Sequence, residues 1–420
     1  MKTFTFSLLF SLLTFASAQA QGYIFAATDQ PDFRFETYNL GAADTAQSRL
    51  QAFVSIIYDD LEFAPVSGGY EANYVIALTV SNKDGQALTR DELTERVHLN
   101  SLAETNSKRT YNFHDFAFDL PPGEYQVTCV VTDQVSKSSS QKIHSKKLRD
   151  FTAAAGPLEI SEAFLAEQAV QSGERSLMIR PGLYENTTAP NREAFIYFEI
   201  YNHVPQAPVV LRQTILNRQK EKLLDQQREW PRQGGKQYVV LPIWTDTLPY
   251  GSYEIVMEVQ SAGIQKTVST NLRVSWDGIP STGIHLGQAL RVAQSVATGE
   301  EKLALEKALI SAIAEQRQAL STFWGKRDKS PDTAENEAMT EFYRRFEIAN
   351  EKFSGSKEGW QTDRGQTFLK YGAPDEIELY SRAAAAQPYQ LWHYRKLNWT
   401  FKFVDEEGLG EFELASHGQK

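Results

Sequence analysis

Apolar and polar residues alternate through much of the first 275 residues, the pattern of a strand that buries one face. Two of these stretches align without a gap, LPPGEYQVTCVV at 120–131 and LPYGSYEIVMEV at 248–259. In both, a Leu-Pro-x-Gly turn precedes a Tyr that opens the strand. We expect a second matched pair upstream, YVIALTVSN ending at Asn82 and FIYFEIYN ending at Asn202. The shared order of these strands predicts a duplicated domain.

Two segments rich in Gly, Pro and small residues interrupt the strand pattern. They are AAAGP at 153–157 and WDGIPSTG at 276–283. Short alternating strands and tight-turn signals such as Asp84-Gly85 dominate on both sides of the first segment, without convincing amphipathic helices between them. This combination favours antiparallel sandwiches of immunoglobulin-like type. We place the two β-sandwich domains at 21–152 and 157–275.

The apolar period lengthens to between three and four residues after Ser281, which is typical of amphipathic helices. Thr298 and Glu301 have the spacing of a capping box and predict the start of a helix. A second helix is expected from Pro331. Packing of the two helices on each other is favoured over a groove for a partner helix. We place a helical connector at 284–322; the apolar residues at helical spacing are Leu305, Ala308, Leu309, Ala312, Ile313 and Leu320, then Ala338, Phe342, Phe346, Ala349 and Phe353.

Alternation with a period of two returns near the C-terminus and predicts three further strands. A small twisted antiparallel sheet, covered by the helix that ends at Phe353, satisfies these patterns in an α+β domain at 323–420. The predicted fold class is therefore mainly β and multidomain, with two tandem immunoglobulin-like β-sandwiches, a helical connector and a small α+β C-terminal domain. The alternating residues of the three strands are Thr367, Leu369 and Tyr371, then Ile377 and Leu379, then Trp399, Phe401 and Phe403.

Composition and charge restrict the class of protein. With 420 residues the chain is long enough for several domains, each with its own core. Its formal net charge of -10 argues against a nucleic-acid binder, because such proteins neutralise phosphates with Lys and Arg. No nucleic-acid partner is therefore expected.

The N-terminus has the pattern of a secretory signal peptide at 1–20. An apolar stretch follows Lys2, and small residues permit cleavage after Ala18 or Ala20. The stretch is shorter than the roughly 20 residues that cross a bilayer comfortably. We expect an exported protein, periplasmic, envelope-associated or secreted, without a transmembrane segment after cleavage. The only cysteine, Cys129, lies far from the signal, so the protein is not expected to be a lipoprotein.

Two conspicuous features of the first domain have structural explanations. Cys129 alternates with Val127 and Val131, which predicts a small buried hydrophobic residue rather than a nucleophile. The basic run at 137–149 could hold an acidic polymer, but a solvated strand face is favoured. Since one thiol cannot form an internal disulfide, large apolar cores must stabilise the domains.

Several motifs follow one another in the C-terminal part of the chain. They are Phe323-Trp324, Lys326-Arg327-Asp328, Asn336-Glu337, Tyr343-Arg344-Arg345, Gly359-Trp360-Gln361-Thr362-Asp363-Arg364-Gly365, Tyr371-Gly372-Ala373-Pro374-Asp375-Glu376, Trp392-His393-Tyr394, and Phe401-Lys402-Phe403-Val404-Asp405 ahead of Gly410. In this order they resemble the GWxTD domain family over roughly Phe323 to Leu414. The resemblance implies an exported bacterial protein, best represented in Bacteroidetes-like envelopes, of a family without an established reaction. Ala373 stands where a second Pro is common in the family, so this turn is expected to be less rigid.

The residues around the five-letter signature suggest binding chemistry. Trp360 supplies a large apolar anchor, Asp363 can cap its own turn, and Arg364 can clamp a carboxylate. Exposed aromatic and Arg side chains are what a binding hot spot requires. Alternatively, the same residues only hold their own domain together. The candidate binding residues are Trp360, Asp363, Arg364, Tyr371, Asp375 and Trp392.

The sequence carries no established catalytic signature. It has no GxSxG, HExxH or phosphate-binding loop, and no Cys with a plausible catalytic His. Paired carboxylates offer an alternative, an envelope hydrolase that uses Asp363 with Asp375 or Glu376. Asp405 and Glu407 could join Glu376 as metal ligands, but the spacing lacks a complete calcium-loop pattern. Neither a metal nor another cofactor is expected.

The function predicted from the sequence is therefore binding rather than catalysis. We expect an exported cell-envelope or secreted interaction or scaffold protein, which binds an envelope protein or glycan through its C-terminal GWxTD-like module. The alternatives are the envelope hydrolase and a purely structural member of a larger assembly.

Overall fold

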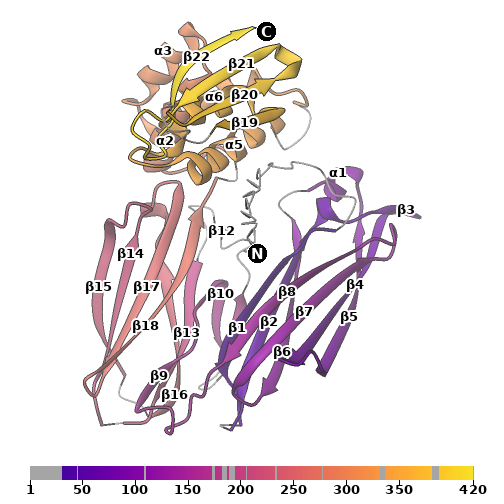
Figure 1. Cartoon of the computed structure of the whole chain (residues 1–420), viewed down its shortest axis with the longest axis vertical. Coiled ribbons are helices and arrows are strands. Elements are labelled where there is room, and N and C mark those ends of the chain that lie inside the picture. The colour runs from indigo at the N-terminus through magenta and orange to yellow at the C-terminus, as the bar shows by residue number, and fades with distance from the viewer. Residues whose placement is uncertain are drawn as a thin grey trace, which may run out of the picture. The chain divides into compact units, whose positions relative to one another are not determined.

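The computed structural model describes residues 31–419 except 45, 108–109, 173–175, 182–186, 189–193, 205, 232–233, 277, 332–335 and 381–386. The predicted signal peptide lies outside this part of the chain. The described chain is mainly β and multidomain (Figure 1), and it divides into a first compact unit that ends at Glu347 and a C-terminal unit that begins at Ile348. Among the described residues, no helix is long and apolar enough to cross a membrane.

The first unit begins with two antiparallel sheets that enclose one apolar core. Alternating residues of both sheets fill this core, among them Leu50, Tyr74 and Val127. The smaller sheet consists, in spatial order, of β1 (Arg34–Gly41), β2 (Ser48–Ile57) and β6 (Tyr111–Leu120). The larger sheet consists of β3 (Ala64–Val66), β4 (Gly69–Asn82), β7 (Gly123–Asp133) and β8 (Ser139–Leu148), with β5 (Ala87–Leu99) also paired to β4; the short helix α1 (Leu102–Thr105) precedes β6.

A second sandwich follows with its own core, in which Ile196, Phe198 and Met257 are fully buried. One sheet has the spatial order β11 (Ser176–Pro181), β10 (Phe164–Ser172), β13 (Ala194–Asn202) and β16 (Gly235–Ile243), with β9 (Leu158–Ile160) also paired to β13. The other has the order β12 (Thr187–Thr188), β18 (Ile264–Val274), β17 (Gly251–Ser261), β14 (Val209–Leu216) and β15 (Lys222–Trp230).

The two sandwiches repeat one strand order. The orders β1-β2-β6 and β5-β4-β7-β8 of the first correspond to β10-β13-β16 and β15-β14-β17-β18 of the second. The same hydrogen bond occurs in each of the two aligned turns. The Tyr125 hydroxyl donates to the Pro121 carbonyl, and the Tyr253 hydroxyl donates to the Pro249 carbonyl. Tyrosines bonded back in this way occur in immunoglobulin domains. The immunoglobulin-like type itself stays a prediction.

The upstream half of the sequence alignment is wrong. β4, which ends at Asn82, corresponds to β14 and not to β13, which ends at Asn202. The matching residue is Asn217, because the side chains of Asn82 and Asn217 both accept a backbone N–H four residues on, from Gln86 and Glu221. Alternation is common to all half-buried strands and cannot identify counterparts, whereas a turn residue with a side-chain contact can.

Aromatic side chains join the two sandwiches. The outer faces of the β1-β2-β6 and β10-β13-β16 sheets pack against each other, so β2 and β13 are buried on both faces. The Phe53 ring lies 5.2 Å from that of Phe164, which lies 4.8 Å from Tyr197. Between the domains, Phe151 stacks on Tyr201 at 4.5 Å. The two sandwiches therefore form one packed body rather than two modules on a flexible linker.

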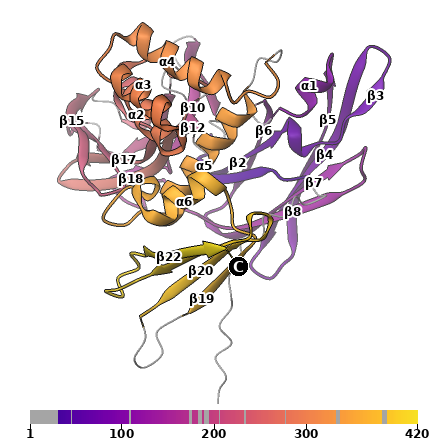
Figure 2. The same cartoon turned by 90° about the horizontal axis from the view of Figure 1, so that it is seen from above.

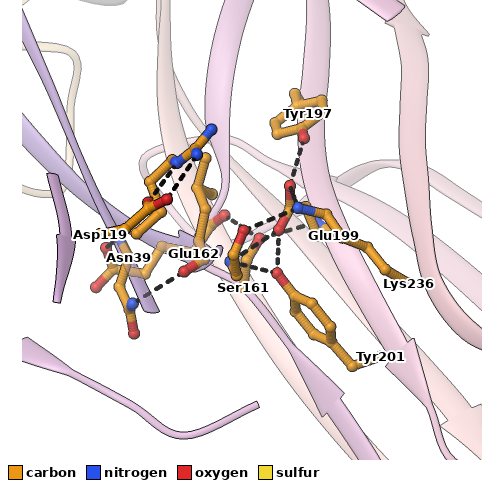
Figure 3. A network of polar contacts seen from close by, with 11 residues as sticks. Asn39, Asp119, Ser161, Glu162, Tyr197, Glu199, Tyr201 and Lys236 are labelled. Carbon is orange, nitrogen blue, oxygen red and sulfur yellow. Dashed lines mark hydrogen bonds and ion pairs between the residues drawn. The ribbon is translucent and has the colours of Figure 1, made fainter. Parts of the chain in front are cut away.

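A buried carboxylate lies beside this aromatic interface (Figure 3). Glu199 is 2% exposed and accepts hydrogen bonds from the hydroxyls of Tyr197, at 2.8 Å, and of Tyr201. It also accepts the Gly41 N–H at 3.0 Å and pairs with Lys236 Nζ at 2.7 Å. Since Gly41 belongs to β1, the carboxylate bonds across the junction. Burial, and after it the Glu199 charge, raise the pKa of Tyr197 and Tyr201, so both phenols remain donors.

Two lysines of the basic run in the first sandwich, Lys142 and Lys146, bond to the neighbouring sheet. Lys142 Nζ donates to the Phe33 carbonyl, and Lys146 Nζ donates to the Thr37 carbonyl at 2.7 Å and to the Glu162 carboxylate. These carbonyls lie along the outer edge of β1. The lysines of β8 therefore cover an edge that would otherwise be open to another strand. The predicted solvated face is limited to the alternate residues of β8.

Cys129 lies in the first core with 0% of its surface exposed, as predicted. Burial raises the pKa of its thiol to about 12, and only the thiolate is reactive. We expect iodoacetamide near neutral pH to leave the native protein unmodified during a time that labels the urea-unfolded chain completely. Intact mass spectrometry checks this result, and fast alkylation of the native protein would contradict it.

Helices complete the first unit. The predicted capping box is confirmed, since the Glu301 carboxylate accepts the Thr298 N–H at 3.0 Å. The predicted first helix is instead two helices, because the backbone is extended at Ala312, which precedes the second of them. The indole N–H of Trp276 donates to His285 Nδ1 at 2.9 Å and fastens the first helix of the group to the end of the second sandwich. The helices are α2 (Gly283–Ala293), α3 (Gly299–Ala308), α4 (Ile313–Gly325) and α5 (Glu337–Phe353), which continues into the C-terminal unit.

The C-terminal unit is a four-stranded antiparallel sheet with helices on one face (Figure 2). This part of the prediction is confirmed. Trp392, Phe401 and Phe403 of the sheet pack against Ala349 of α5 and Phe368 of a further helix. The strands, in spatial order, are β19 (Glu376–Tyr380), β20 (Tyr389–Tyr394), β21 (Trp399–Val404) and β22 (Glu413–Gln419).

The predicted strand at Thr367, Leu369 and Tyr371 is wrong, because these residues lie in helix α6 (Asp363–Tyr371). Thr367 and Leu369 are both buried together with the residue between them, which an alternating strand would turn to the other face. Gly372, with a φ of 79°, ends the helix in a conformation that suits glycine. α6 thus adds a second helix to the covered face of the sheet.

Candidate functional site

The signature segment, Gly359–Gly365, connects three elements of the C-terminal unit. It begins after α5, forms a short 3-10 turn over Gly359–Gln361 and continues into the first turn of α6. Its two glycines allow unusually close backbone contacts. A Cβ on Gly359 would lie 1.9 Å from the Ala349 carbonyl oxygen, and a Cβ on Gly365 would lie 1.9 Å from the Gly359 carbonyl oxygen. The glycines therefore let the turn lie directly on α5, and α6 directly on the turn.

Trp360 fixes the turn to its neighbours from both backbone and side chain. Its N–H donates to the Asn350 side chain at 3.0 Å, and its carbonyl accepts from the Gln366 side chain at 2.7 Å. The half-buried ring packs against the core of the unit, and its indole N–H donates to Glu358. Trp360 is thus an apolar anchor, as predicted, with its own domain as the partner.

Thr362 rather than Asp363 caps the turn. The Thr362 hydroxyl accepts the Gly365 N–H at 3.1 Å and donates to the Gly359 carbonyl at 2.7 Å. Asp363 is the first residue of α6, where a negative charge stabilises a helix. Its carboxylate accepts the Leu414 N–H of β22 at 2.7 Å. Thr362 therefore holds the turn to the start of α6, and Asp363 connects that start to the last strand.

Asp363→Ala is expected to lower the stability of the C-terminal unit by about 1 kcal/mol, because it removes the bond to the Leu414 N–H and the charge at the helix start. Asp363→Asn keeps an acceptor and should cost less. Urea unfolding and hydrogen exchange of the Leu414 amide measure the two effects. Unchanged exchange at Leu414 in the alanine variant would show that the contact does not hold β22.

Arg364 is half-buried and stacks between two aromatic rings. Its guanidinium carbon lies 5.2 Å from the centroid of Phe353 and 4.5 Å from that of Phe412, within the range of cation–π attraction. Nη2 donates to the Gly410 carbonyl at 3.2 Å. Arg364 thereby joins α6 to the loop before β22.

The other candidates lie beyond the signature. Trp392 is 1% exposed in the core, so it is not accessible to a partner. Tyr371 is half-buried against Phe401 at a centroid distance of 5.2 Å. Asp375 is exposed, and its carboxylate accepts the Arg395 N–H at 2.7 Å.

The structure does not bring together the carboxylates of the alternative hydrolase. Asp363 opens α6 and Asp375 follows its end, and the nine residues of the helix span about 13 Å. Glu376, beside Asp375, pairs with Arg395 at 2.6 Å. The Asp363 carboxylate thus contacts β22, whereas those of Asp375 and Glu376 contact Arg395 directly after β20. This separation leaves no shared position for a substrate bond.

The acidic turn proposed as a source of metal ligands has another role. Asp405 is buried, and its two carboxylate oxygens accept the N–H groups of Leu409 at 3.1 Å and Gly410 at 2.8 Å. Among the residues that the structure describes, no group of three His, Cys, Asp or Glu side chains could hold a metal ion.

A shallow pocket lies beside the signature segment. Its volume is about 70 Å³, and it is lined by Phe353 and by the segments 355–357, 361–364 and 410–413. The sequence predicted a role for 361–364 but not for the other two segments, because no local sequence pattern indicates that they contact the signature segment. Glu411 joins them, since its carboxylate accepts the Ser356 N–H at 2.7 Å. Hydrogen bonds from Ser356 lower the pKa of Glu411 and keep it ionised.

Exposed charged and polar side chains surround the pocket, and the residues beneath them are engaged in contacts within the domain. Exposed side chains around it include Lys357, Gln361 and Glu413, whereas Thr362 and Arg364 are half-buried in contacts of their own domain. The arrangement offers hydrogen-bonding and charged groups of both signs.

Comparisons with known proteins give one specific match. No curated protein matches the chain. Among solved structures, the chain is similar to dimeric latent PorU from Porphyromonas gingivalis, with 12% identity over 60% of this chain and 21% of that chain and a TM-score of 0.24. It is also similar to Parabacteroides merdae β-glucuronidase, with 8% identity, 62% and 36% coverage and a TM-score of 0.21. A third similar structure is trypsin-activated alpha-2-macroglobulin from Escherichia coli, with 9% identity over 59% of this chain and 17% of that chain and a TM-score of 0.18. The chain thus spans 17% to 36% of the lengths of these proteins, and such TM-scores support no structural or functional argument.

The specific match is to the GWxTD domain, over residues 296–417. It takes in α3 and α4 as well as the signature segment, and so begins before Phe323, where the sequence resemblance was placed. The chain is therefore a GWxTD domain-containing protein.

Proposed function

We propose that this protein is an exported cell-envelope or secreted interaction or scaffold protein, which binds an envelope protein or glycan through its GWxTD domain. The observation that carries the proposal is the pocket beside the signature segment, where exposed polar and charged groups surround residues that are engaged in holding the domain together. A binding surface needs such a rigid base, because pre-organised side chains lose little entropy on association.

Export is the part of the proposal that rests on sequence alone. The basic residue, apolar stretch and small residues at 1–20 support a signal peptide. The packed pair of sandwiches supports a scaffold role, because their two cores and shared aromatic junction form one stable body.

The experiment compares the full chain with surface variants as bait in envelope extract. Lys357→Glu combined with Gln361→Ala changes two exposed residues of the pocket rim. Lys396→Glu is the matched control, since it makes the same charge change at an exposed position on another turn of the C-terminal unit. We expect the rim variant to lose a partner that the wild type and the control both retain. Recovery of every partner by a chain that contains only the two sandwiches would show that binding lies elsewhere.

A further inference from the structure

The outer edge of β19 has an unusual surface. β19 ends the C-terminal sheet and, among the described residues, pairs with β20 alone. Three of its five residues are large exposed hydrophobic residues, namely Ile377 at 37%, Leu379 at 65% and Tyr380 at 41%. The longer edge strands β5 and β15 each expose only one, Leu88 and Leu223. An edge strand with exposed apolar residues is a template for pairing with another chain.

The charged side chains of β19 are not placed to prevent another strand from pairing with this edge. Natural edge strands are protected by charged side chains that repel an added strand. Here Glu378 is drawn back over β20, where it bonds His393 Nε2 at 2.9 Å and also accepts from the Tyr380 hydroxyl at 2.6 Å. Glu376 is drawn toward Arg395 after β20. The two carboxylates therefore lie on one face of the strand beside the edge and leave its backbone accessible.

The two faces of β19 differ in chemistry. Because side chains alternate along a strand, Ile377 and Leu379 lie on one face and Glu376, Glu378 and Tyr380 on the other. A strand added to this edge would continue both faces. Its residues on the first face would contact aliphatic side chains, and those on the second would lie beside two carboxylates.

We propose that the outer edge of β19 binds an extended segment of a partner protein as an added strand, with aliphatic and basic residues alternating along it. This edge is separate from the pocket, because β19 and β22 lie at opposite edges of the sheet and only β22 reaches the pocket. The inference extends the proposed binding function to a protein partner rather than a glycan, because main-chain hydrogen bonds along a sheet edge are made by polypeptides. A second copy of this chain is disfavoured. Antiparallel pairing of two β19 strands would bring four carboxylates together across one face.

Two labelled peptides test the proposal with the full chain. One alternates lysine with valine, and the other alternates glutamate with valine. Fluorescence anisotropy should show binding of the lysine peptide about tenfold tighter than that of the glutamate peptide, because only the former complements the carboxylates. On binding, hydrogen exchange should slow in residues 376–380. Equal affinities, no binding, or protection confined to other segments would overturn the proposal.

Leu379→Lys places a positive charge on the edge strand, which disfavours an added strand, and it should weaken binding of the lysine peptide about tenfold. Leu409→Lys is the matched control, since Leu409 is 75% exposed on a turn of the same unit and should leave the affinity unchanged. Undiminished binding by Leu379→Lys would also overturn the proposal. If Leu379→Lys still recovers the envelope partner that the wild type recovers, the edge is not the binding site while the proposed function stands. If the wild type recovers none, the proposed function itself fails.

Discussion

Gly365→Ala is expected to destabilise the C-terminal unit by more than about 3 kcal/mol, because overpacking is most costly where nothing can yield. The added Cβ would lie 1.9 Å from the Gly359 carbonyl oxygen and 2.9 Å from the Trp360 Cα. Both atoms belong to the backbone, so no change of rotamer relieves the clash. α6 would have to move away from the turn, which would break the bonds of Thr362 to Gly365 and of Gln366 to Trp360.

Urea unfolding followed by tryptophan fluorescence and near-ultraviolet circular dichroism measures this loss. Gly418→Ala is the control, since a Cβ on Gly418 in β22 meets no atom within 4 Å. We expect Gly418→Ala to unfold like the wild type. If Gly365→Ala does so too, the start of α6 does not lie against the turn as described.

Glu199→Ala is expected to cost the first unit about 3 kcal/mol, because the hydroxyls of Tyr197 and Tyr201 lose a buried acceptor, at about 1–3 kcal/mol for each donor left unpaired. The substitution leaves Lys236 without its carboxylate and removes one of the two acceptors of the Gly41 N–H, the other being the Tyr201 hydroxyl. The hydroxyls of Tyr197 and Tyr201 lose the same acceptor in a site that water does not reach easily. Because Gly41 lies in β1 and Glu199 in β13, the loss falls on the junction of the two sandwiches.

Thermal unfolding by calorimetry tests this prediction, with Glu258→Ala as the control. Glu258 pairs with Arg212 at 3.6 Å on an exposed sheet face, where an ion pair contributes at most about 1 kcal/mol. The Glu199→Ala protein should melt at a lower temperature than the control and in a broader transition, since the sandwiches would unfold less cooperatively. Equal melting curves for the two variants would mean that the buried carboxylate does not stabilise the junction.

The sequence predicted the strands of the sandwich cores because one-sided burial leaves a period of two. Tyr253, Ile255, Met257 and Val259 are buried on one face of β17, as expected. β13 could not be placed by the same rule, because its second face is covered by the other sandwich and eight of its nine residues are buried. Burial by a distant surface leaves no local signal, and this is why β13 was aligned with the wrong counterpart.

The missed helix α6 shows the opposite case, in which a local signal was present. The segment TFLKY fits both a short strand and a short helix. Thr367, Leu369 and Tyr371 occupy alternate positions, as on one face of a strand, whereas the adjacent apolar residues Phe368 and Leu369 fit the buried face of a helix. Its boundaries distinguish the two structures. Thr362 has the chemistry of a helix cap, and Gly372 that of a helix end. Reading these boundary residues before the alternation would have predicted the helix.

The candidate site was located better than its contacts were. The signature gave the position of the pocket, since Thr362 and Arg364 line it. Sequence could not supply the partners, because Leu414, Phe412 and Gly410 meet the segment only after the sheet has formed. It also could not show that Trp392 is inaccessible, because tryptophans occur both in cores and at binding surfaces.

The aromatic and ionic junction between the sandwiches has a mechanical consequence. A tether of small residues would let two domains pivot and would dissipate tension, but Phe53, Phe164 and Glu199 bond the sandwiches side by side. Tension applied at either sandwich would be transmitted to the other until this junction ruptured. The two sandwiches would therefore resist a pulling force as one body, and the force needed to separate them would be set by the strength of this junction.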